Sequence, residues 1–346
     1  MPKKDKKEKE DKKEKKNKKE LNNFDALKEQ LEKSFGKIVE AAKPVKRVST
    51  TIPSFDYLFG SGLPLGRIVE FFGQEGSGKS LLATQMMSAA QFAGLPCALI
   101  DMERSFDSQF ATELGLSVEG DKFLRVCPAH AQQAFDVMYR IAKLYKVIVV
   151  DSVAAMVPEE EIAKEGVSWG FSKQPLIMAA GLRKLIPIIA EHGSTVVFVN
   201  QLRAAFAMFS QEESPGGRAL KFYSSLRLRI STIGGKKGAI EVDGERVGHM
   251  IRVEGAKTKC SSCEHEVVEI PVIYKRNNMY SIGVDRIFDL FYLAVRLGVL
   301  NPHNRKFGPN EVCLGQNRDQ ALMNLRVDQD LLKQLKAEVY LNIKER

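Results

Sequence analysis

Short apolar runs alternate with amphipathic segments along the middle of the chain. The apolar runs are rich in β-branched residues and predict the strands Ile68–Phe72, Cys97–Asp101, Phe123–Cys127, Val147–Asp151 and Thr195–Asn200. The segments between them have helical spacing and predict the helices Leu81–Phe92, Ser105–Leu114, Gln132–Leu144 and Gln174–Glu191. This alternation predicts an α/β fold with a mainly parallel, doubly wound sheet. Ligands bind such sheets at the carboxyl ends of the strands.

The pattern changes after residue 200. Further strands that alternate like antiparallel pairs or hairpins are predicted at Ser225–Ile230, Met250–Val253 and Val267–Tyr274. Beyond Gly283, helices are predicted at Arg286–Leu297 and Gln329–Ile343. We therefore expect a core over residues 51–282 and a small C-terminal α+β domain over residues 283–346.

The N-terminal region has two parts. Residues 1–20 hold eleven Lys and six Asp or Glu, with no large apolar residue after Met1, which predicts a disordered tail. Such a tail either attracts a polyanion weakly or serves as a solubilising leader. Residues 21–50 are predicted to form a helix and a linker, because Phe24, Leu27, Leu31 and Phe35 follow helical spacing. The apolar stripe of this helix packs either on a neighbouring subunit or on its own domain.

The composition is that of a globular protein, with 44% hydrophobic and 27% charged residues. Because no apolar run approaches the ~20 residues of a membrane span and the N-terminus lacks the apolar core of a signal peptide, we expect a cytoplasmic protein without a membrane partner. The net charge of +9 is compatible with nucleic acid but does not establish it. Cys260 and Cys263 lie near His265 and leave a zinc site open, although the absence of a second such pair favours two free thiols in a hairpin.

One segment between a predicted strand and a predicted helix fits the phosphate-loop pattern G-x-x-x-x-G-K-[ST] at every fixed position. The segment is Gly73-Gln74-Glu75-Gly76-Ser77-Gly78-Lys79-Ser80. Its glycines let successive backbone N–H groups point at phosphates, and the following helix adds its positive end. Lys79 is expected to reach the β- and γ-phosphates of ATP, and the Ser80 hydroxyl is expected to ligate Mg²⁺.

Three further polar residues follow predicted strands. Asp151 ends a strongly apolar strand and is expected to hold Mg²⁺ together with Ser80. Glu103 either orients and deprotonates the attacking water or caps the next helix. Gln201 ends another buried strand, where an uncharged amide can sense the γ-phosphate and act as a switch for the loop that follows.

Two glycine-containing loops carry aromatic residues. The loop over residues 202–217 contains Arg203, Phe206 and Phe209, ends in Gly216 and Gly217, and is followed by Arg218. The loop over residues 158–173 contains Trp169, Gly170 and Phe171. Single-stranded nucleic acid offers bases for the apolar side chains and phosphates for the arginines. The alternatives are a loop buried against its own domain and a tryptophan that anchors the core.

The motifs, taken in order, resemble the RecA-type strand-exchange recombinases of bacteria and phages. The resemblance extends from about residue 22 to the C-terminus. The matching segments are the phosphate loop with the preceding Gly62-Leu63-Pro64-Leu65-Gly66-Arg67-Ile68-Val69-Glu70, then Ile100-Asp101-Met102-Glu103, Val149-Val150-Asp151-Ser152-Val153-Ala154-Ala155, Asn200-Gln201-Leu202-Arg203 and Gly216-Gly217-Arg218-Ala219-Leu220-Lys221-Phe222-Tyr223. The last segment is far more specific than a phosphate loop.

The resemblance implies a DNA-dependent ATPase that forms a helical filament on single-stranded DNA, pairs it with homologous double-stranded DNA and exchanges strands. ATP with Mg²⁺ is then bound between subunits, and the N-terminal helix docks on a neighbour. By the same resemblance, the catalytic set is Lys79, Glu103 and the γ-phosphate sensor Gln201. The adenine contacts are Asp107 and Phe110, and the contacts to ATP of the adjacent subunit are Lys257 and Lys259. The DNA contacts are Arg183, Arg203 and the loops around Trp169 and Phe209.

The chain departs from the family pattern in three places. Cys260-Ser261-Ser262-Cys263 follows the lysine pair, the 206–215 loop is slightly shorter and more acidic, and the chain ends without an acidic tail. These departures are compatible with a phage-encoded or divergent member. Two rival interpretations are a hexameric helicase-like motor and a DNA-coating mediator without strand exchange. A motor would form closed rings, and an intact Lys79 with Glu103 and Asp151 argues against a non-catalytic mediator.

Overall fold

The computed structural model describes residues 23–36, 44–162, 173–202, 216–308 and 310–345. The chain divides into two units, Met1–Pro44 and Val45–Arg346, and each is described by itself. Some predicted features lie outside the described residues: the tail over residues 1–20 and the DNA contacts Trp169, Gly170, Phe171, Arg203 and Phe209.

The first unit contains a helix over residues 23–35. Phe24, Leu27 and Phe35 are exposed, and Leu31 is partly buried. A helix is therefore present where the apolar spacing predicts one, and three of these four apolar side chains are exposed within this unit. Such a stripe is stabilised when it packs against another surface.

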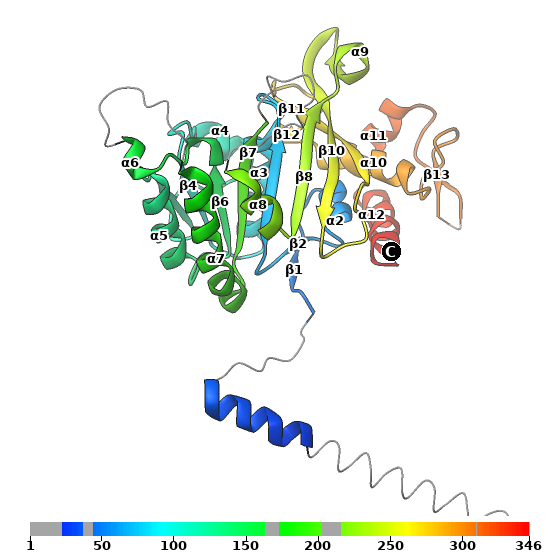
Figure 1. Cartoon of the computed structure of the whole chain (residues 1–346). Coiled ribbons are helices and arrows are strands. Elements are labelled where there is room, and N and C mark those ends of the chain that lie inside the picture. Colours follow the sequence, from blue (N-terminus) through cyan, green and yellow to red (C-terminus); the bar gives the residue numbers. More distant parts are fainter. Residues whose placement is uncertain (1–22, 37–43, 163–172, 203–215, 309, 346) are drawn as a thin grey trace, which may run out of the picture. The chain divides into compact units, whose positions relative to one another are not determined.

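A ten-stranded sheet organises the described part of the second unit (Figure 1). Six neighbouring strands run parallel, in the spatial order β8 (Leu226–Thr232), β3 (Ile68–Gly73), β7 (Thr195–Gln201), β6 (Val147–Asp151), β4 (Cys97–Asp101) and β5 (Phe123–Val126). Antiparallel strands continue the sheet beyond β8, namely β10 (Glu245–Thr258), β11 (Val267–Ile273) and β12 (Gly283–Val284), with β9 (Ala239–Val242) beside β10. The sheet is thus mainly parallel, as the sequence predicts.

Two details of the sheet differ from the predicted pattern. Strand β8 pairs parallel with β3, although it also pairs antiparallel with β10. The connection from β7 to β8 contains helix α8 (Gly217–Tyr223), and a helical crossover returns the chain in the parallel direction. Strand β10 is much longer than the predicted Met250–Val253. It pairs with β8 and β11 beyond that segment, where polar residues such as Glu254 interrupt the apolar run.

Helices cover both faces of the sheet. On one face, α5 (Ala131–Ile141), α7 (Gln174–His192) and α8 pack against Ile148 and Phe198. On the other face, α3 (Lys79–Phe92) and α4 (Ser108–Glu113) pack against Phe71 and Val149. Residues two apart on a strand share a face, so each fully buried strand contributes to both cores. The doubly wound α/β fold is confirmed.

Short elements link the main ones: β1 (Arg47–Val48), α2 (Pro53–Leu58), β2 (Leu63–Pro64), the 3₁₀ turn η1 (Val153–Ala155), α6 (Glu159–Ile162) and α9 (Gly235–Gly238). The C-terminal region consists of α10 (Arg286–Arg296), the hairpin β13 (Lys306–Phe307) and β14 (Val312–Cys313), α11 (Arg318–Val327) and α12 (Gln329–Glu345). Helix α10 packs on α2 and β11, and α12 also contacts α2. The C-terminal elements therefore share a core with the start of the second unit, and the domain boundary at residue 283 stays a prediction.

Two carboxylates are buried where α2 meets these C-terminal helices. Asp56 accepts hydrogen bonds from the Tyr340 hydroxyl, at 2.8 Å, and from polar groups of residues 49 and 50. Asp289 accepts a hydrogen bond from the backbone N–H of Ser54, at 2.9 Å. Burial raises the pKa of Asp289 to about 7, and the nearby carboxylates of Asp56 and Asp285 add to the increase.

The raised pKa of Asp289 predicts a pH-dependent stability. Between its ordinary pKa of 3.8 and its folded pKa of about 7, the folded protein holds a proton that the unfolded chain has lost. The contribution of this group to stability is therefore full below about pH 4 and is lost as the pH rises to about 7. The Asp289→Asn variant stays neutral and is expected to unfold roughly 5 °C above the wild type at pH 8, with little difference near pH 4.

Thermal unfolding of both proteins across this pH range measures the effect. The exposed Asp330→Asn variant is a matched control, because its side chain remains in solvent and pairs with Lys333 at the surface. A pH dependence of the unfolding temperature that is identical in wild type and Asp289→Asn would contradict the assignment.

Candidate nucleotide-binding site

The carboxyl ends of four neighbouring strands bring the predicted site residues together. In the register of the sheet, Gly73 lies opposite Gln201, and Asp101 lies opposite Asp151. Strand β6 is also the neighbour of β7, which places the ends of β3, β7, β6 and β4 along one edge. Residues from four separate parts of the sequence therefore form one site.

The loop between β3 and α3 has the geometry of a phosphate cradle. Gly76 and Gly78 adopt positive φ angles of 71° and 89°, which favour glycine. A Cβ at Gly73 would lie 1.9 Å from the carbonyl oxygen of Ile230, so this position accepts no larger residue. Helix α3 begins at Lys79, and its first N–H groups face the loop because they have no carbonyl partner within the helix. The loop thus offers backbone donors and the positive end of a helix to an anion.

The Lys79 ammonium group is held inside this loop. Its Nζ donates hydrogen bonds to the carbonyl oxygen of Gln74, at 2.6 Å, and to Ser77 Oγ, at 3.3 Å. Burial lowers the pKa of Lys79, and the carboxylates of Asp151 and Glu103 partly oppose the decrease. A largely buried cation placed in this way is a strong attractor for phosphate.

Asp151 and Ser80 offer adjacent oxygen atoms at the end of β6 and the start of α3. The Ser80 side chain and Asp151 line the same cavity, and Ser80 lies close enough to lower the pKa of the Asp151 carboxyl. The pKa of Asp151 is raised to about 6, chiefly by burial; the carboxylates of Glu103 and Asp101 contribute to the increase, whereas Ser80 and Lys79 oppose it. A half-buried carboxylate near a hydroxyl fits a hard cation, since Mg²⁺ prefers oxygen ligands.

Glu103 is exposed and lies within reach of the same site. Its Oε1 accepts a hydrogen bond from Ser152 Oγ and one from Gln201 Nε2, the latter at 3.4 Å. The cap of the following helix α4 is Asp107, whose Oδ1 accepts from the N–H groups of Gln109 and Phe110. The capping alternative for Glu103 therefore does not describe this structure.

A cavity of about 130 Å³ lies beside the phosphate loop. Its lining includes Ser80, Asp151, Asp107 and the exposed ring of Phe110. The two residues that the resemblance assigns to adenine thus share a cavity with the two that are expected to hold Mg²⁺.

An ion pair that no sequence motif predicted joins Asp101 to Arg125. Asp101 is buried, and its Oδ2 accepts hydrogen bonds from Arg125, at 2.6 Å from Nη2 and 3.1 Å from Nε. Its oxygens also accept from the N–H groups of Ser105 and Phe106, at 3.3 Å each. This carboxylate therefore holds the turn that carries Glu103. In the sequence, Asp101 is visible as an acid at a strand end. Its partner Arg125 lies on a different strand, so the sequence does not show the pairing.

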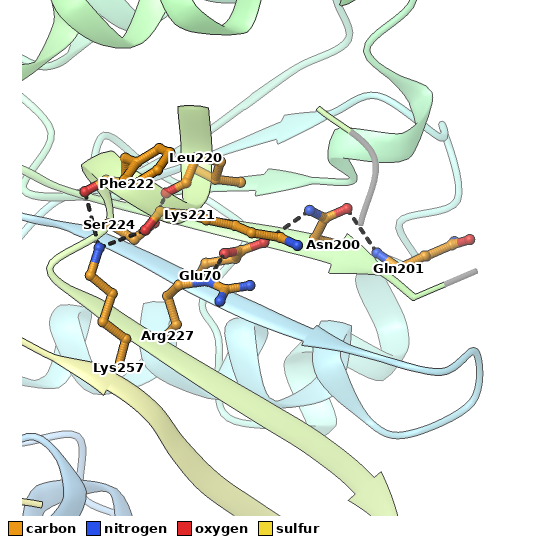
Figure 2. A network of polar contacts seen from close by, with 9 residues as sticks. All are labelled: Glu70, Asn200, Gln201, Leu220, Lys221, Phe222, Ser224, Arg227 and Lys257. Atoms are coloured by element: carbon orange, nitrogen blue, oxygen red, sulfur yellow. Dashed lines mark hydrogen bonds and ion pairs between the residues drawn. The ribbon is translucent and has the colours of Figure 1, made fainter. Parts of the chain in front are cut away.

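Lys257 and Lys259 lie at the end of β10, beside the C-terminal end of α8. Lys257 Nζ donates to the carbonyl oxygens of Lys221, at 2.5 Å, and Phe222, at 3.0 Å (Figure 2). Lys259 Nζ donates to the carbonyl oxygen of Phe222 at 3.2 Å. Cations at this helix end are favoured by its dipole.

The two predicted DNA loops have their C-terminal ends side by side. Gln174 lies shortly after residues 163–172, and its Oε1 accepts a hydrogen bond from the N–H of Gly216 at 3.2 Å. Gly216 and Gly217 have positive φ angles at the start of α8, where Arg218 is exposed. Arg183 is exposed on α7. The two described arginines among the DNA candidates are thus accessible to a ligand.

The cysteine segment lies against the start of the second unit. The Cys263 thiol donates to the carbonyl oxygen of Tyr57 at 3.3 Å, and the Cys260 carbonyl oxygen accepts from Arg47. Within the described ranges, no three His, Cys, Asp or Glu side chains are grouped so that they could hold a metal ion. In the same part of the chain, no helix is both long and apolar enough to span a bilayer.

Comparison with known proteins agrees with these features. The model of the RecA N-terminal domain matches residues 22–278. Protein RecA of Chloroherpeton thalassium is 36% identical over 322 residues, which cover 90% of this chain and 87% of that protein. Protein RecA of Thermus thermophilus is 35% identical over 320 residues, 89% and 91% of the two chains. Protein RecA of Aquifex pyrophilus is 34% identical over 322 residues, 89% and 88% of the two chains.

These matches run through the core and beyond it, so they favour neither a helicase-like motor nor a mediator without strand exchange. They also agree with the order of motifs and with the mainly parallel sheet. The chain therefore belongs to the RecA family of strand-exchange recombinases, which are DNA-dependent ATPases.

Proposed function

We propose that this recombinase binds ATP with Mg²⁺ at the carboxyl edge of β3, β7, β6 and β4. Lys79 and the N–H groups of the phosphate loop bind the β- and γ-phosphates. Ser80 and Asp151 hold the metal ion, which supplies charge neutralisation at the phosphates. Phe110 stacks on the adenine, and Asp107 recognises its edge. The cavity that these residues share supports this arrangement.

Glu103 is the catalytic carboxylate of the proposed reaction. It orients the attacking water and accepts its proton as the bond to the γ-phosphorus forms. One carboxylate oxygen is held by Ser152 and Gln201, which leaves the other oxygen for the water. The exposure of Glu103 allows water and nucleotide to approach it.

Gln201 couples the nucleotide to DNA, and its contact with Glu103 is the observation that carries the proposal. The Gln201 amide group donates to the Glu103 carboxylate. A γ-phosphate offers a more highly charged acceptor nearby, so we expect the amide to move to it when ATP binds. Gln201 directly precedes the predicted DNA loop over residues 202–217, so a movement of Gln201 is transmitted to that loop. Only the difference in ATP affinity between the two states drives the change.

The partners follow from the same scheme. Single-stranded DNA is bound by the loops around Trp169 and Phe209, with Arg183, Arg203, Gly216, Gly217 and Arg218. Homologous double-stranded DNA is then paired with the bound strand. The helix over residues 23–35 docks its exposed stripe on a neighbouring subunit, and Lys257 and Lys259 reach the ATP of the adjacent subunit. The protein acts in the cytoplasm.

Replacing Gln201 with Ala is expected to uncouple DNA binding from the nucleotide. The wild type should bind a labelled single-stranded oligonucleotide about tenfold or more tightly with a non-hydrolysable ATP analogue than without it. In Gln201→Ala the ratio of the DNA affinities with and without the analogue should fall to about one, because no amide at position 201 can contact the γ-phosphate. Fluorescence anisotropy measures the DNA affinity, and a labelled nucleotide reports ATP binding.

The exposed Gln334→Ala variant, on α12, controls for the loss of an amide side chain. ATP binding by Gln201→Ala should stay within about threefold of the wild type, since one of several phosphate contacts is lost. A nucleotide-dependent DNA affinity that survives in Gln201→Ala would sink the proposed coupling.

A further inference from the structure

A buried group of three polar side chains lies behind Gln201. Glu70 on β3 and Asn200 on β7 are fully buried, and Arg227 on β8 is almost so (Figure 2). The three come from adjacent parallel strands, and Glu70 lies opposite Arg227 in the register. None of them belongs to the phosphate loop or to the proposed catalytic set.

The hydrogen bonds of this group form a continuous chain to the sensor. Arg227 Nε donates to Glu70 Oε2 at 2.5 Å, and Asn200 Nδ2 donates to Glu70 Oε1 at 2.9 Å. Asn200 Oδ1 then accepts from the backbone N–H of Gln201 at 3.0 Å. The Arg227 guanidinium also lies 4.3 Å from the centre of the Phe72 ring, which holds it in place.

The direction of the chain depends on Glu70. An ionised carboxylate only accepts hydrogen bonds, so Asn200 must turn its Nδ2 towards Glu70. Its Oδ1 must then face Gln201. The charge on Glu70 thereby determines which atom of Asn200 meets the backbone of the sensor.

Burying an ion pair inside a sheet costs free energy of desolvation. Well-packed apolar residues of similar volume are often at least as stable, because two charges must be desolvated. The neighbouring strand positions here are mainly apolar, as in Phe71 and Phe198. A function other than stability therefore explains the polar group better than packing does.

We propose that Glu70 is a positioning residue for Gln201, acting through Asn200 and neutralised by Arg227. This inference rests on the proposed role of Gln201 as the γ-phosphate sensor. The same group extends towards α8, which follows the predicted DNA loop over residues 202–217. Arg227 lies opposite Lys257 in the sheet, and Lys257 donates hydrogen bonds to the last carbonyl groups of α8. Glu70 thus joins the peptide of the sensor to the strand beside α8.

The Glu70→Gln variant tests the proposal because it changes donors and acceptors with little change in shape. Arg227 only donates, so the new amide at position 70 must turn its oxygen to Arg227 and its NH₂ group to Asn200. Asn200 must then turn its oxygen to that NH₂ group, which leaves its own Nδ2 facing the N–H of Gln201. We expect the DNA-stimulated kcat to fall about tenfold, with the KM for ATP within about twofold of the wild type.

A second substitution should restore the pattern. When Glu70→Gln is combined with Asn200→Asp, the new carboxylate at position 200 accepts from both the amide at position 70 and the N–H of Gln201. The net charge of the group is then that of the wild type. We expect the kcat of this double variant to return to within about threefold of the wild type. A purely structural role predicts that kcat changes only when the unfolding temperature changes, whereas a positioning role lowers kcat in a Glu70→Gln protein that stays folded.

Thermal unfolding of each variant accompanies the kinetics, and Glu269→Gln, in an exposed pair with Arg252, is the control for an acid-to-amide change. A wild-type kcat in Glu70→Gln, or a double variant no more active than the single one, would overturn the proposal. If Glu70→Gln fails to fold, the double variant is compared with the wild type. A folded double variant within about threefold in kcat then supports the proposal, and an unfolded or inactive one overturns it.

The experiment also separates this inference from the proposed sensor. If Gln201→Ala keeps its nucleotide-dependent DNA affinity, the sensor role itself fails. If Gln201→Ala loses that dependence while Glu70→Gln keeps a wild-type kcat, only the positioning role of Glu70 fails.

Discussion

Lys79→Ala is expected to abolish ATP hydrolysis, with or without single-stranded DNA. The ammonium group is buried inside the phosphate loop and is held by Gln74 and Ser77, so it is already in place for an incoming phosphate. Loss of one preorganised charge at a transition state costs about 10²–10³ in kcat. Removal of the cation also leaves Asp151 and Glu103 facing the triphosphate without compensation, which should weaken ATP binding as well.

Phosphate release with excess ATP measures the rate, and a labelled nucleotide measures binding. The Lys143→Ala variant removes an exposed lysine elsewhere on the second unit and should hydrolyse ATP like the wild type. Hydrolysis by Lys79→Ala within a few fold of the wild type would show that the nucleotide binds elsewhere.

Glu103→Ala is expected to separate binding from turnover. ATP should still bind, because the phosphate loop, Ser80 and Asp151 are unchanged. Hydrolysis should fall about 10²–10⁴-fold, since the carboxylate that we propose as acceptor of the proton of the water is gone. The ATP-bound state that grips DNA should then persist, so complexes with single-stranded DNA should outlive those of the wild type.

Single-turnover phosphate release and the dissociation rate of a labelled oligonucleotide test both parts. The Glu103→Gln variant keeps an oxygen for the Ser152 and Gln201 donors, so it distinguishes loss of the base from loss of these contacts. Glu119→Ala removes an exposed acid outside the site and is the control. Undiminished hydrolysis in Glu103→Ala would overturn the catalytic assignment.

The two variants together distinguish the two uses of ATP. A loss of DNA binding in Lys79→Ala with a gain in Glu103→Ala would mean that nucleotide binding, rather than hydrolysis, closes the DNA loops. Hydrolysis would then serve to release the strand. Similar DNA affinities in both variants would mean that DNA binding does not depend on the nucleotide.

Much of the fold could be predicted because its signals are local. An apolar run such as Val147–Asp151, with amphipathic helices before and after it, is typical of a buried parallel strand, and the structure confirms its bounds. The phosphate loop is equally local, because its glycines, Lys79 and Ser80 act within one turn between a strand and a helix. The strand order along the sheet follows from the same α/β pattern only in outline.

Other features failed to appear in the sequence because their partners are distant. Helix α11 was not predicted, although Ala321, Leu322 and Leu325 are buried in it. Strand β8 runs parallel to β3 because α8 precedes it, which the alternating pattern of β8 did not reveal. An aspartate such as Asp289 looks like a surface residue until packing buries it. Each of these features depends on packing against residues that are distant in the sequence.

By itself, the sequence determined the alternation of strands and helices, the phosphate loop and the family to which the chain belongs. Only the tertiary structure decided that Gln201 contacts Glu103 and that Glu70 pairs with both Asn200 and Arg227. The physical reason is one of range. Periodicity and turn chemistry act over a few residues, whereas a buried charge finds its partner only when strands distant in sequence become neighbours in the sheet.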